Sequence, residues 1–198
     1  RIGGVALDLP EGWTDRCRQF LEYFEPKVPE YNRLLTYNPI FIKRTAGVGV
    51  LPPALAIDYG CTGPVLRGSG VRWDLRRDDP YSVYPRLAFD VPIGRGEMGT
   101  VGDCWDRYWV RMEEMRQSVR ILRQALDMLP AGPHAARVSR MLKVAPGEVY
   151  VRTENPRGEL GVFLVSDGSL KPYRCNLRAP CFCNLSVIDA ISRGCLVA

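Results

Sequence analysis

The 198-residue sequence has no apolar run approaching the ~18 residues that a membrane-spanning helix needs. It also lacks the pattern of a secretory signal peptide. Its one histidine, His134, lies in a connector rich in proline and glycine, with no obvious carboxylate or serine partner in sequence. These absences argue against a membrane-spanning chain and leave histidine-based acid–base or nucleophilic catalysis with almost no support.

The C-x-x-C spacing of metal-binding cysteines is also missing. The seven cysteines are odd in number and scattered, which indicates a reducing compartment and mostly free thiols. Cys181 and Cys183 are the closest pair, but zinc sites more often use C-x-x-C spacing. Side chains two residues apart chelate poorly in the extended segment expected there, and four thiolates at cluster spacing are absent. We therefore interpret both cysteines as structural.

Charge is only mildly unbalanced. The chain has 27 basic and 22 acidic residues, a net charge of +5, and its arginines are spread along the sequence. This balance is too weak to indicate nucleic-acid binding. Hydrophobic residues make up 46% of the chain, which is ample for a core.

One motif resembles a dinucleotide fingerprint, the G-x-G-x-x-G run at residues 94–99. Pro92 interrupts the preceding strand, the helix starts only after Gly102, and no ribose-binding acid follows on a second parallel strand. A flexible loop is the better interpretation.

A long helix is predicted over residues 103–129. Asp103 is a suitable N-cap, and Pro130 with Gly132 ends the pattern. Apolar residues recur at alternating steps of four and three, which predicts a seam packed against other helices. The seam comprises Tyr108, Met112, Met115, Val119, Leu122, Leu126 and Leu129. The charged residues on the other faces are explained most simply as a solvated surface.

The remaining chain predicts an α+β fold. Helices are expected at 11–24, at 30–44 with a break at Pro39, at 54–59 and from 189, with long ordered loops at 60–102 that include an extended piece at 87–91. Alternating patterns separated by two turns predict a three-stranded meander at 148–153, 159–166 and 171–177.

The loop from Leu66 to Arg77 is rich in arginine and glycine. It could grip phosphate or nucleic acid, but arginine also suits buried and interface ion pairs. Asp74, Asp78 and Asp79 supply partners within or beside the loop, which favours ion pairs inside the protein or with a neighbouring subunit.

Several sequence blocks together resemble the D subunit, or 49 kDa-type subunit, of NADH:quinone oxidoreductase (respiratory complex I). The blocks keep the family's order and cover nearly the whole chain: residues 1–10, 62–70, 73–76, 80–81, 89–92, 102–118, 158–161 and 165–174. Jointly they are very specific.

The resemblance implies a fold related to nickel–iron hydrogenase large subunits that have lost the metal, with a helical core and a small antiparallel β meander near the C-terminus. It implies a role in the quinone-reduction chamber of a proton-pumping complex. The expected partners are the subunit of the terminal iron–sulfur cluster, the 30 kDa-type subunit, membrane-arm subunits and quinone, and not nucleic acid. The expected location is peripheral to the membrane, on the cytoplasmic side of the bacterial inner membrane or, alternatively, the mitochondrial matrix side.

The family's quinone-headgroup ligands lie on segments before the first block, so the resemblance assigns no catalytic, cofactor-binding or metal-binding residue to this chain. Quinone and the cluster would be held in the complex. We expect residues 1–198 to be a fragment of a single larger domain: 1–60 helical, 61–102 long ordered loops, 103–129 the core helix and 147–178 the meander. Residues 95–101 look like a loop insertion relative to the family.

The charge density of the arginine-rich loop and the long helix predicts contacts with other subunits. The candidate interface residues are Arg67, Arg72, Arg76, Glu113, Glu114 and Arg116. Two alternatives stay open. A membrane-bound nickel–iron hydrogenase large subunit would have two C-x-x-C pairs, which this chain lacks, and a non-catalytic scaffold derived from the same fold would need no cofactor.

Overall fold

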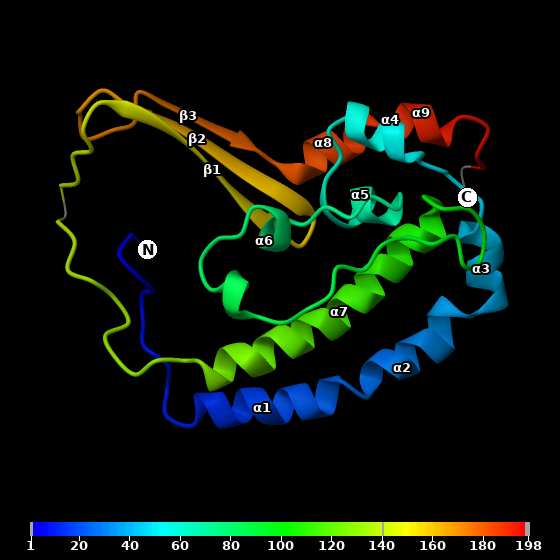
Figure 1. Ribbon diagram of the computed structural model, residues 1–198, viewed down its shortest axis with the longest axis horizontal. Coiled ribbons are helices and arrows are strands. Elements are labelled where there is room, and N and C mark those ends of the chain that lie inside the picture. Colours follow the sequence, from blue (N-terminus) through cyan, green and yellow to red (C-terminus); the bar gives the residue numbers. More distant parts are fainter. Residues whose placement is uncertain (1, 140, 197–198) are drawn as a thin grey trace.

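The computed structural model describes residues 2–139 and 141–196. The long helix α7 runs through the middle, with α1, α2 and α3 along one side of it and a three-stranded sheet beyond α5 and α6 on the other (Figure 1). The predicted α+β class is confirmed. The helices are α1 (Trp13–Phe24), α2 (Lys27–Tyr31), η1 (Asn32–Thr36), α3 (Pro39–Thr45), α4 (Pro53–Asp58), α5 (Gly63–Gly68), α6 (Leu75–Asp78), η2 (Tyr84–Arg86), α7 (Cys104–Asp127), α8 (Pro180–Ser186) and α9 (Ile188–Ser192).

Helix α7 agrees with the sequence pattern at both ends. Its N-cap is Asp103, whose Oδ1 accepts the backbone amide of Asp106 at 2.8 Å. The seam is unevenly buried: Met112 and Val119 are inside, whereas Leu122 is 43% exposed. Trp105 is fully buried, and α7 contacts α5 as well as α1, α2 and α3, so the helix has neighbours on more than one side.

The helix expected over 30–44 is divided into three pieces. Helix α2 begins earlier than expected, because Pro29 lies in the first turn, where its missing amide costs no helical hydrogen bond. The π-helical turn η1 follows directly. The chain then breaks before Pro39, where the Asn38 side chain accepts the Ile40 amide at 2.9 Å and starts α3.

The loop region 60–102 contains more helix than the sequence predicted. It holds the short helices α5 and α6 and the 3-10 turn η2. Leu87 has extended backbone angles, but residues 87–91 form no strand, and the side chains of Leu87 and Phe89 are buried. The glycine run at 94–99 is a loop held by two bonds: the Gly94 amide donates to the Arg67 carbonyl at 2.8 Å, and the Gly96 amide donates to Asp106 Oδ2 at 2.9 Å.

The sheet is an antiparallel meander in the order β1-β2-β3, as predicted. Strands β1 (Gly147–Asn155) and β2 (Gly158–Ser166) pair along their whole length, and β3 (Arg174–Arg178) pairs with β2. Asn155 pairs with Gly158, so Pro156 and Arg157 form the turn.

The extended segment predicted around Cys181 and Cys183 is wrong, because both residues lie on α8. Pro180 occupies the first turn of this helix, where proline is well tolerated. Residues i and i+2 share a face in a strand but point about 200° apart on a helix, so the two side chains diverge on α8. Helix α9 starts next to α8, close to where the sequence placed it.

A hydrophobic cluster joins α4, α5 and α9. It consists of Leu51, Ala56, Cys61, Leu66 and Val187, with Trp73 and Ile191 packed against it. Among the described residues, no helix has both the length and the apolar character required to cross a bilayer.

Candidate functional site

Arg67 is the centre of a buried charge cluster. The arginine lies near the end of α5 and is 1% exposed. Its guanidinium lies 2.6 Å from Glu114 Oε1 and 2.9 Å from Glu154 Oε1, and it also donates to the Trp73 carbonyl at 2.9 Å. Asp74 is 3.5 Å away. One cation therefore connects α5, α7, the start of α6 and the end of β1.

A second arginine completes the cluster. Asp74 is the N-cap of α6 and accepts both the backbone amide and the side chain of Arg76, with the shortest contact at 2.6 Å. The Arg76 guanidinium lies 5.0 Å from the centre of the Phe89 ring, a cation–π contact. The cluster thus sets two guanidinium groups against the carboxylates of Asp74, Glu114 and Glu154.

The pKa values of Asp74 and Glu154, the two most buried carboxylates of the cluster, change in opposite directions. Burial alone raises the pKa of Asp74, but the hydrogen bonds from Arg76 and the charge of Arg67 outweigh it, so the pKa of Asp74 is lowered. The pKa of Glu154 is raised, first by burial and further by the nearby charge of Asp74, against the opposing effect of Arg67.

The six predicted interface residues divide into two groups. The structure brings Arg67, Arg76 and Glu114 together in the cluster, where their charges are used inside the chain. The others remain nearer the surface. Arg72 is 59% exposed and 3.6 Å from Asp78, and Arg116 is 44% exposed and pairs with Glu113 at 3.2 Å.

Sequence reasoning missed Glu154 and Arg111. Glu154 is 87 residues from Arg67, and its only sequence signal is its place at the end of a predicted strand. Arg111 lies on α7, one turn after Arg107, whose carbonyl it contacts, and no pattern distinguishes it from the other arginines of that helix.

The cluster forms one wall of a charged cleft. The cleft is a cavity of about 480 Å³ between α7 and the β1–β2 turn. Its lining consists of Arg67, Arg76, Tyr84, Arg111, Glu114, Met115, Ser118, Glu154, Asn155, Pro156 and Arg157. Both signs of charge occur there, so the cleft is suited to a polar occupant.

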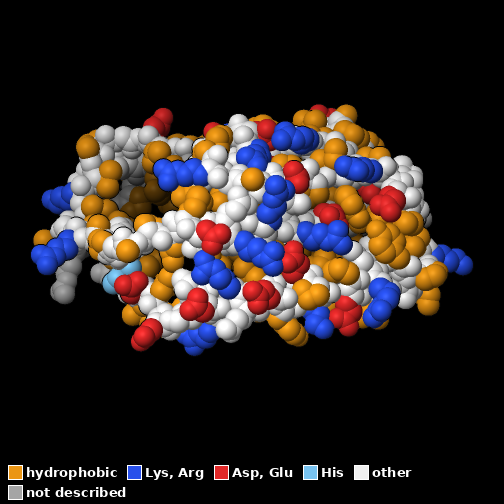
Figure 2. Space-filling view, turned by 60° about the horizontal axis from the view of Figure 1, so that its bottom comes forward, with side chains coloured by type: hydrophobic (Ala, Val, Ile, Leu, Met, Phe, Trp, Pro, Cys, Tyr) orange, Lys and Arg blue, Asp and Glu red, His pale blue; other side chains and the backbone are white. Residues whose placement is uncertain are grey.

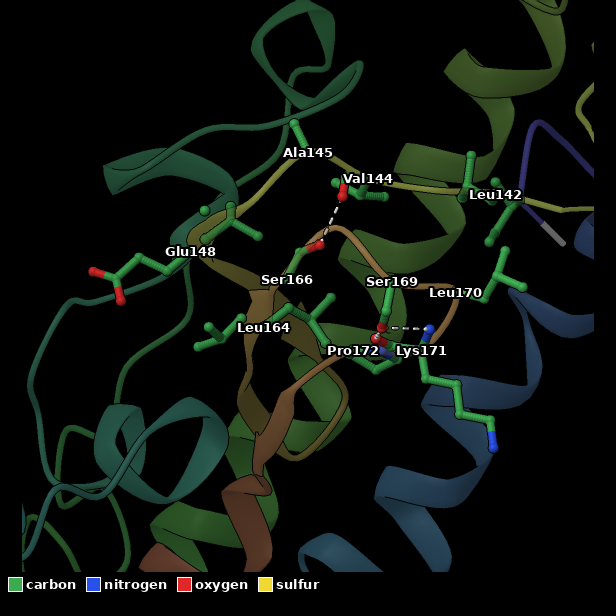
Figure 3. A pocket seen from close by; sticks show the side chains of 14 residues that line it. Leu142, Val144, Ala145, Glu148, Leu164, Ser166, Ser169, Leu170, Lys171 and Pro172 are labelled. Carbon is green, nitrogen blue, oxygen red and sulfur yellow. Dashed lines mark hydrogen bonds between the residues drawn. The ribbon is translucent and has the colours of Figure 1, made fainter.

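An apolar groove of about 480 Å³ lies at the other end of the sheet. Leu142 and Val144 of the connector line it from one side, with Leu164 and Leu170 across from them (Figure 3). A hydrogen bond of 2.8 Å from the Ser166 hydroxyl to the Val144 carbonyl ties the connector to the sheet. A hollow rimmed by hydrophobic side chains is visible at the left of Figure 2, whereas basic and acidic side chains are interspersed over the middle of that face.

The start of α7 contains a buried carboxyl group with an unused atom. Asp106 Oδ2 accepts the amides of Gly96 at 2.9 Å and Gly102 at 3.3 Å, while Oδ1 has no hydrogen-bond partner within the described ranges. Burial is the main reason that the pKa of Asp106 is raised. Gly102 permits this packing, because its φ is +89° and a Cβ atom would lie 2.2 Å from the Leu51 carbonyl oxygen.

The potential metal ligands are dispersed. Residues 2–139 and 141–196 contain no group of three or more His, Cys, Asp or Glu side chains that could hold a metal ion. His134 is exposed, with Nδ1 3.7 Å from Asp8, a neighbour that its sequence surroundings did not reveal. All seven cysteines are free thiols, and burial raises the pKa of Cys61.

Comparisons with known proteins place these features in a family. A family model described as "Respiratory-chain NADH dehydrogenase, 49 Kd subunit" matches residues 1–142 and 134–198. The chain is 52% identical to an NADH-quinone oxidoreductase D subunit (number 2) of Anaeromyxobacter dehalogenans (strain 2CP-C), over 100% of this chain and 52% of the relative. It is 50% identical to the NADH-quinone oxidoreductase D subunit of Chlorobaculum tepidum, over 99% of this chain and 50% of the relative.

The chain therefore spans about half the length of the curated relatives that it matches. The family match nevertheless covers both sides of the charge cluster, from α5 to β1. On these grounds the chain belongs to the family of the 49 kDa subunit of respiratory-chain NADH dehydrogenase.

Proposed function

We propose that this chain is part of an NADH:quinone oxidoreductase and helps to form the quinone-reduction chamber beside the subunit of the terminal iron–sulfur cluster. The observation that carries this proposal is the identity of about half of all positions to NADH-quinone oxidoreductase D subunits, along the whole chain. The complex would oxidise NADH, reduce quinone and translocate protons, and this chain alone would be inactive.

The charge cluster supports a scaffold role for the chain. Arg67 connects α7 to β1 and α6 through contacts of 2.6 to 3.5 Å, which restrains the helix relative to the sheet. A chamber that positions quinone beside an electron donor needs walls that keep their geometry. No catalytic residue is assigned here; quinone and the cluster would be held with groups from other segments or subunits.

Exposed apolar side chains support contact with further protein. Phe182 is 80% exposed, Tyr173 76% and Leu177 63%, all near the C-terminal end of the sheet or just after it. Burying such side chains against another protein removes apolar surface from water, which is favourable. They fit the proposal that residues 1–198 belong to a larger domain packed against the iron–sulfur, 30 kDa-type and membrane-arm subunits.

The exposed charges are proposed as direct contacts with those subunits. Arg72 and Arg116 are 59% and 44% exposed, so a neighbour can reach their side chains, and Glu113 is held at the surface as the partner of Arg116. Arg67, Arg76 and Glu114 would contribute through the wall of the charged cleft. Charge reversal by Arg116→Glu should therefore reduce the amount of this chain retained in the complex. Retention equal to that of the unmodified chain would rule Arg116 out as a contact.

The proposal is tested by purifying the membrane-associated complex through a tag on this chain. We expect co-purification of other oxidoreductase subunits, together with quinone-dependent NADH oxidation. A complex in which this chain sits on the cytoplasmic side of a bacterial inner membrane, rather than the mitochondrial matrix side, should be accessible to protease only in inverted vesicles. If the tagged chain carries down no other subunit, the proposed function is wrong.

A further inference from the structure

The charged cleft between α7 and the β1–β2 turn contains two arginines that form no ion pair with the part of the chain that the structure describes. Within the described residues, neither Arg111 nor Arg157 has a carboxylate within 4.0 Å, although both line the cleft, and the Arg157 guanidinium makes only a 3.6 Å contact with Cys181 Sγ. Arg67 and Arg76, by contrast, are each held by carboxylates at less than 3 Å. The arginines of the inner wall therefore have carboxylate partners, whereas Arg111 at the α7 edge and Arg157 at the turn edge have none among the described residues.

Arg111 is placed where a negative charge would stabilise it. One of its Nη1 hydrogen bonds goes to the Arg107 carbonyl. The pKa of its guanidinium is lowered, first by desolvation and then by the positive charges of Arg107 and Arg67, although Glu114 opposes them. Arg111 is nevertheless exposed, so an incoming anion can reach its guanidinium and offset the repulsion from the neighbouring cations.

The lining also limits what the anion can be. Glu114 and Glu154 face the same cavity, so an occupant with two or more negative charges would be repelled by them. Tyr84, Met115 and Pro156 offer apolar surface beside the arginines, which suits a short side chain with its backbone. A guanidinium binds a planar carboxylate through two parallel hydrogen bonds.

We infer that the charged cleft is a docking site for a peptide segment of another subunit that carries a single carboxylate, which Arg111 and Arg157 receive. The inference rests on the proposed function, because it requires the chain to be part of a complex. It adds the chemistry of the partner, whose carboxylate belongs to an aspartate, a glutamate or a chain terminus. The rest of the segment carries little charge and is small enough to fit a cavity of about 480 Å³.

The test uses the complex purified through the tagged chain. Arg111→Lys keeps the positive charge and introduces an amine that a carbodiimide couples directly to a carboxylate in contact with it. We expect mass spectrometry to find this amine joined to an acidic residue or C-terminus of another subunit. Arg16→Lys is the matched control, because Arg16 is exposed on α1, lies outside the cleft and has no ion pair in the described chain.

A second variant measures how much the contact matters. Arg111→Gln removes the charge, and we expect the chain to dissociate from the complex at least about tenfold more readily in a salt wash, as is usual when one partner of an interface charge pair is lost. Arg16→Gln should release no more than the unmodified chain does.

The outcomes separate the two proposals. Coupling of Arg111→Lys only to Glu114 or Glu154 of its own chain, or no coupling at all, in a complex that still contains the unmodified chain would overturn the docking site and leave the proposed function standing. A third outcome is that Arg111→Lys couples only within its own chain and that added inorganic phosphate prevents this coupling. That result would identify a small-anion site and would overturn the docking site. If no other subunit co-purifies, both proposals fail.

Discussion

The two halves of α7 have the same apolar seam and a similar density of charge, but they lie in different surroundings. In the N-terminal half Trp105, Val110 and Met112 are buried, and Glu114 contacts the fully buried Arg67. In the C-terminal half only Val119 is buried among the described side chains, and Leu122 is 43% exposed. There the ion pairs lie at the surface: Arg120 pairs with Asp90 at 3.0 Å, and Arg123 pairs with Glu25, the C-cap of α1, at 2.5 Å.

The difference is due to the elements that cross the helix. Helix α5 packs against the first half, where the cluster also brings in β1, whereas α1 and the segment around Asp90 lie along the second (Figure 1). Burial on several sides desolvates a charge and makes its partners essential, while water screens a pair at the surface. Sequence periodicity alone therefore does not reveal which charges stabilise the fold.

Removing the central cation should produce the largest effect. Arg67→Met leaves the carboxylates of Asp74, Glu114 and Glu154 close together without their shared partner, so we expect a loss of about 3–5 kcal/mol in the free energy of unfolding. Urea unfolding followed by far-UV circular dichroism measures this loss. Arg120→Met in the other half should cost less than about 1 kcal/mol. Similar losses for both variants would contradict the contrast between the halves.

Shortening apolar side chains of the α7 seam should show the same contrast between the two halves, with smaller losses in the free energy of unfolding. Met112 is 5% exposed, so Met112→Ala removes buried apolar atoms and leaves a cavity, for an expected loss of about 2–4 kcal/mol. Leu122→Ala, at a half-exposed position of the same seam, should cost about 1 kcal/mol or less. The measurement is the urea midpoint at an unchanged m-value. A larger loss for Leu122→Ala would mean that the second half of α7 is covered in solution.

Substitution of the N-cap of α7 should have the next largest effect on stability. Asp103 accepts the amides of Asp106 at 2.8 Å and Thr100 at 3.0 Å, and also that of Gly47 at 2.8 Å, so Asp103→Ala removes the acceptor of three backbone amides, of which that of Asp106 is buried. We expect a loss of about 2 kcal/mol, the upper end for a helix cap. Asp127→Ala removes an exposed carboxylate at the other end of the helix and is the control, with little change expected. Equal thermal midpoints for the two variants would argue against the cap.

The features that were predictable from sequence are those that depend on nearby residues. The N-cap and end of α7, the three strands and the pairing of arginines with Asp74 and Asp78 all follow from patterns within a few residues. The contacts of Arg67 with Glu114 and Glu154 span 47 and 87 positions, and only the tertiary fold brings them together. The proline before Cys181 was a helix-start signal that the expectation of an extended segment overrode.

The pH dependence of stability offers the finest test of the buried half. Because burial raises the pKa of Asp106 in the folded state, the unfolded chain releases this proton first as the pH rises. The contribution of the group is therefore fully present below the unfolded value, near pH 4, and is lost as the pH rises through the folded value. Asp106→Asn keeps an oxygen for the Gly96 amide but cannot ionise.

We expect the stability of the unmodified chain relative to Asp106→Asn to fall as the pH rises from about 4 to about 8, as measured by urea midpoints at each pH. Asp167→Asn provides the opposite sign, because hydrogen bonds from Ser169 lower the pKa of the exposed Asp167. There the unmodified chain should gain slightly relative to the variant as the pH rises. A flat difference for Asp106→Asn would mean that its carboxyl group is as well solvated as one at the surface, and that the start of α7 is more open than its packing against Gly96 and Gly102 implies.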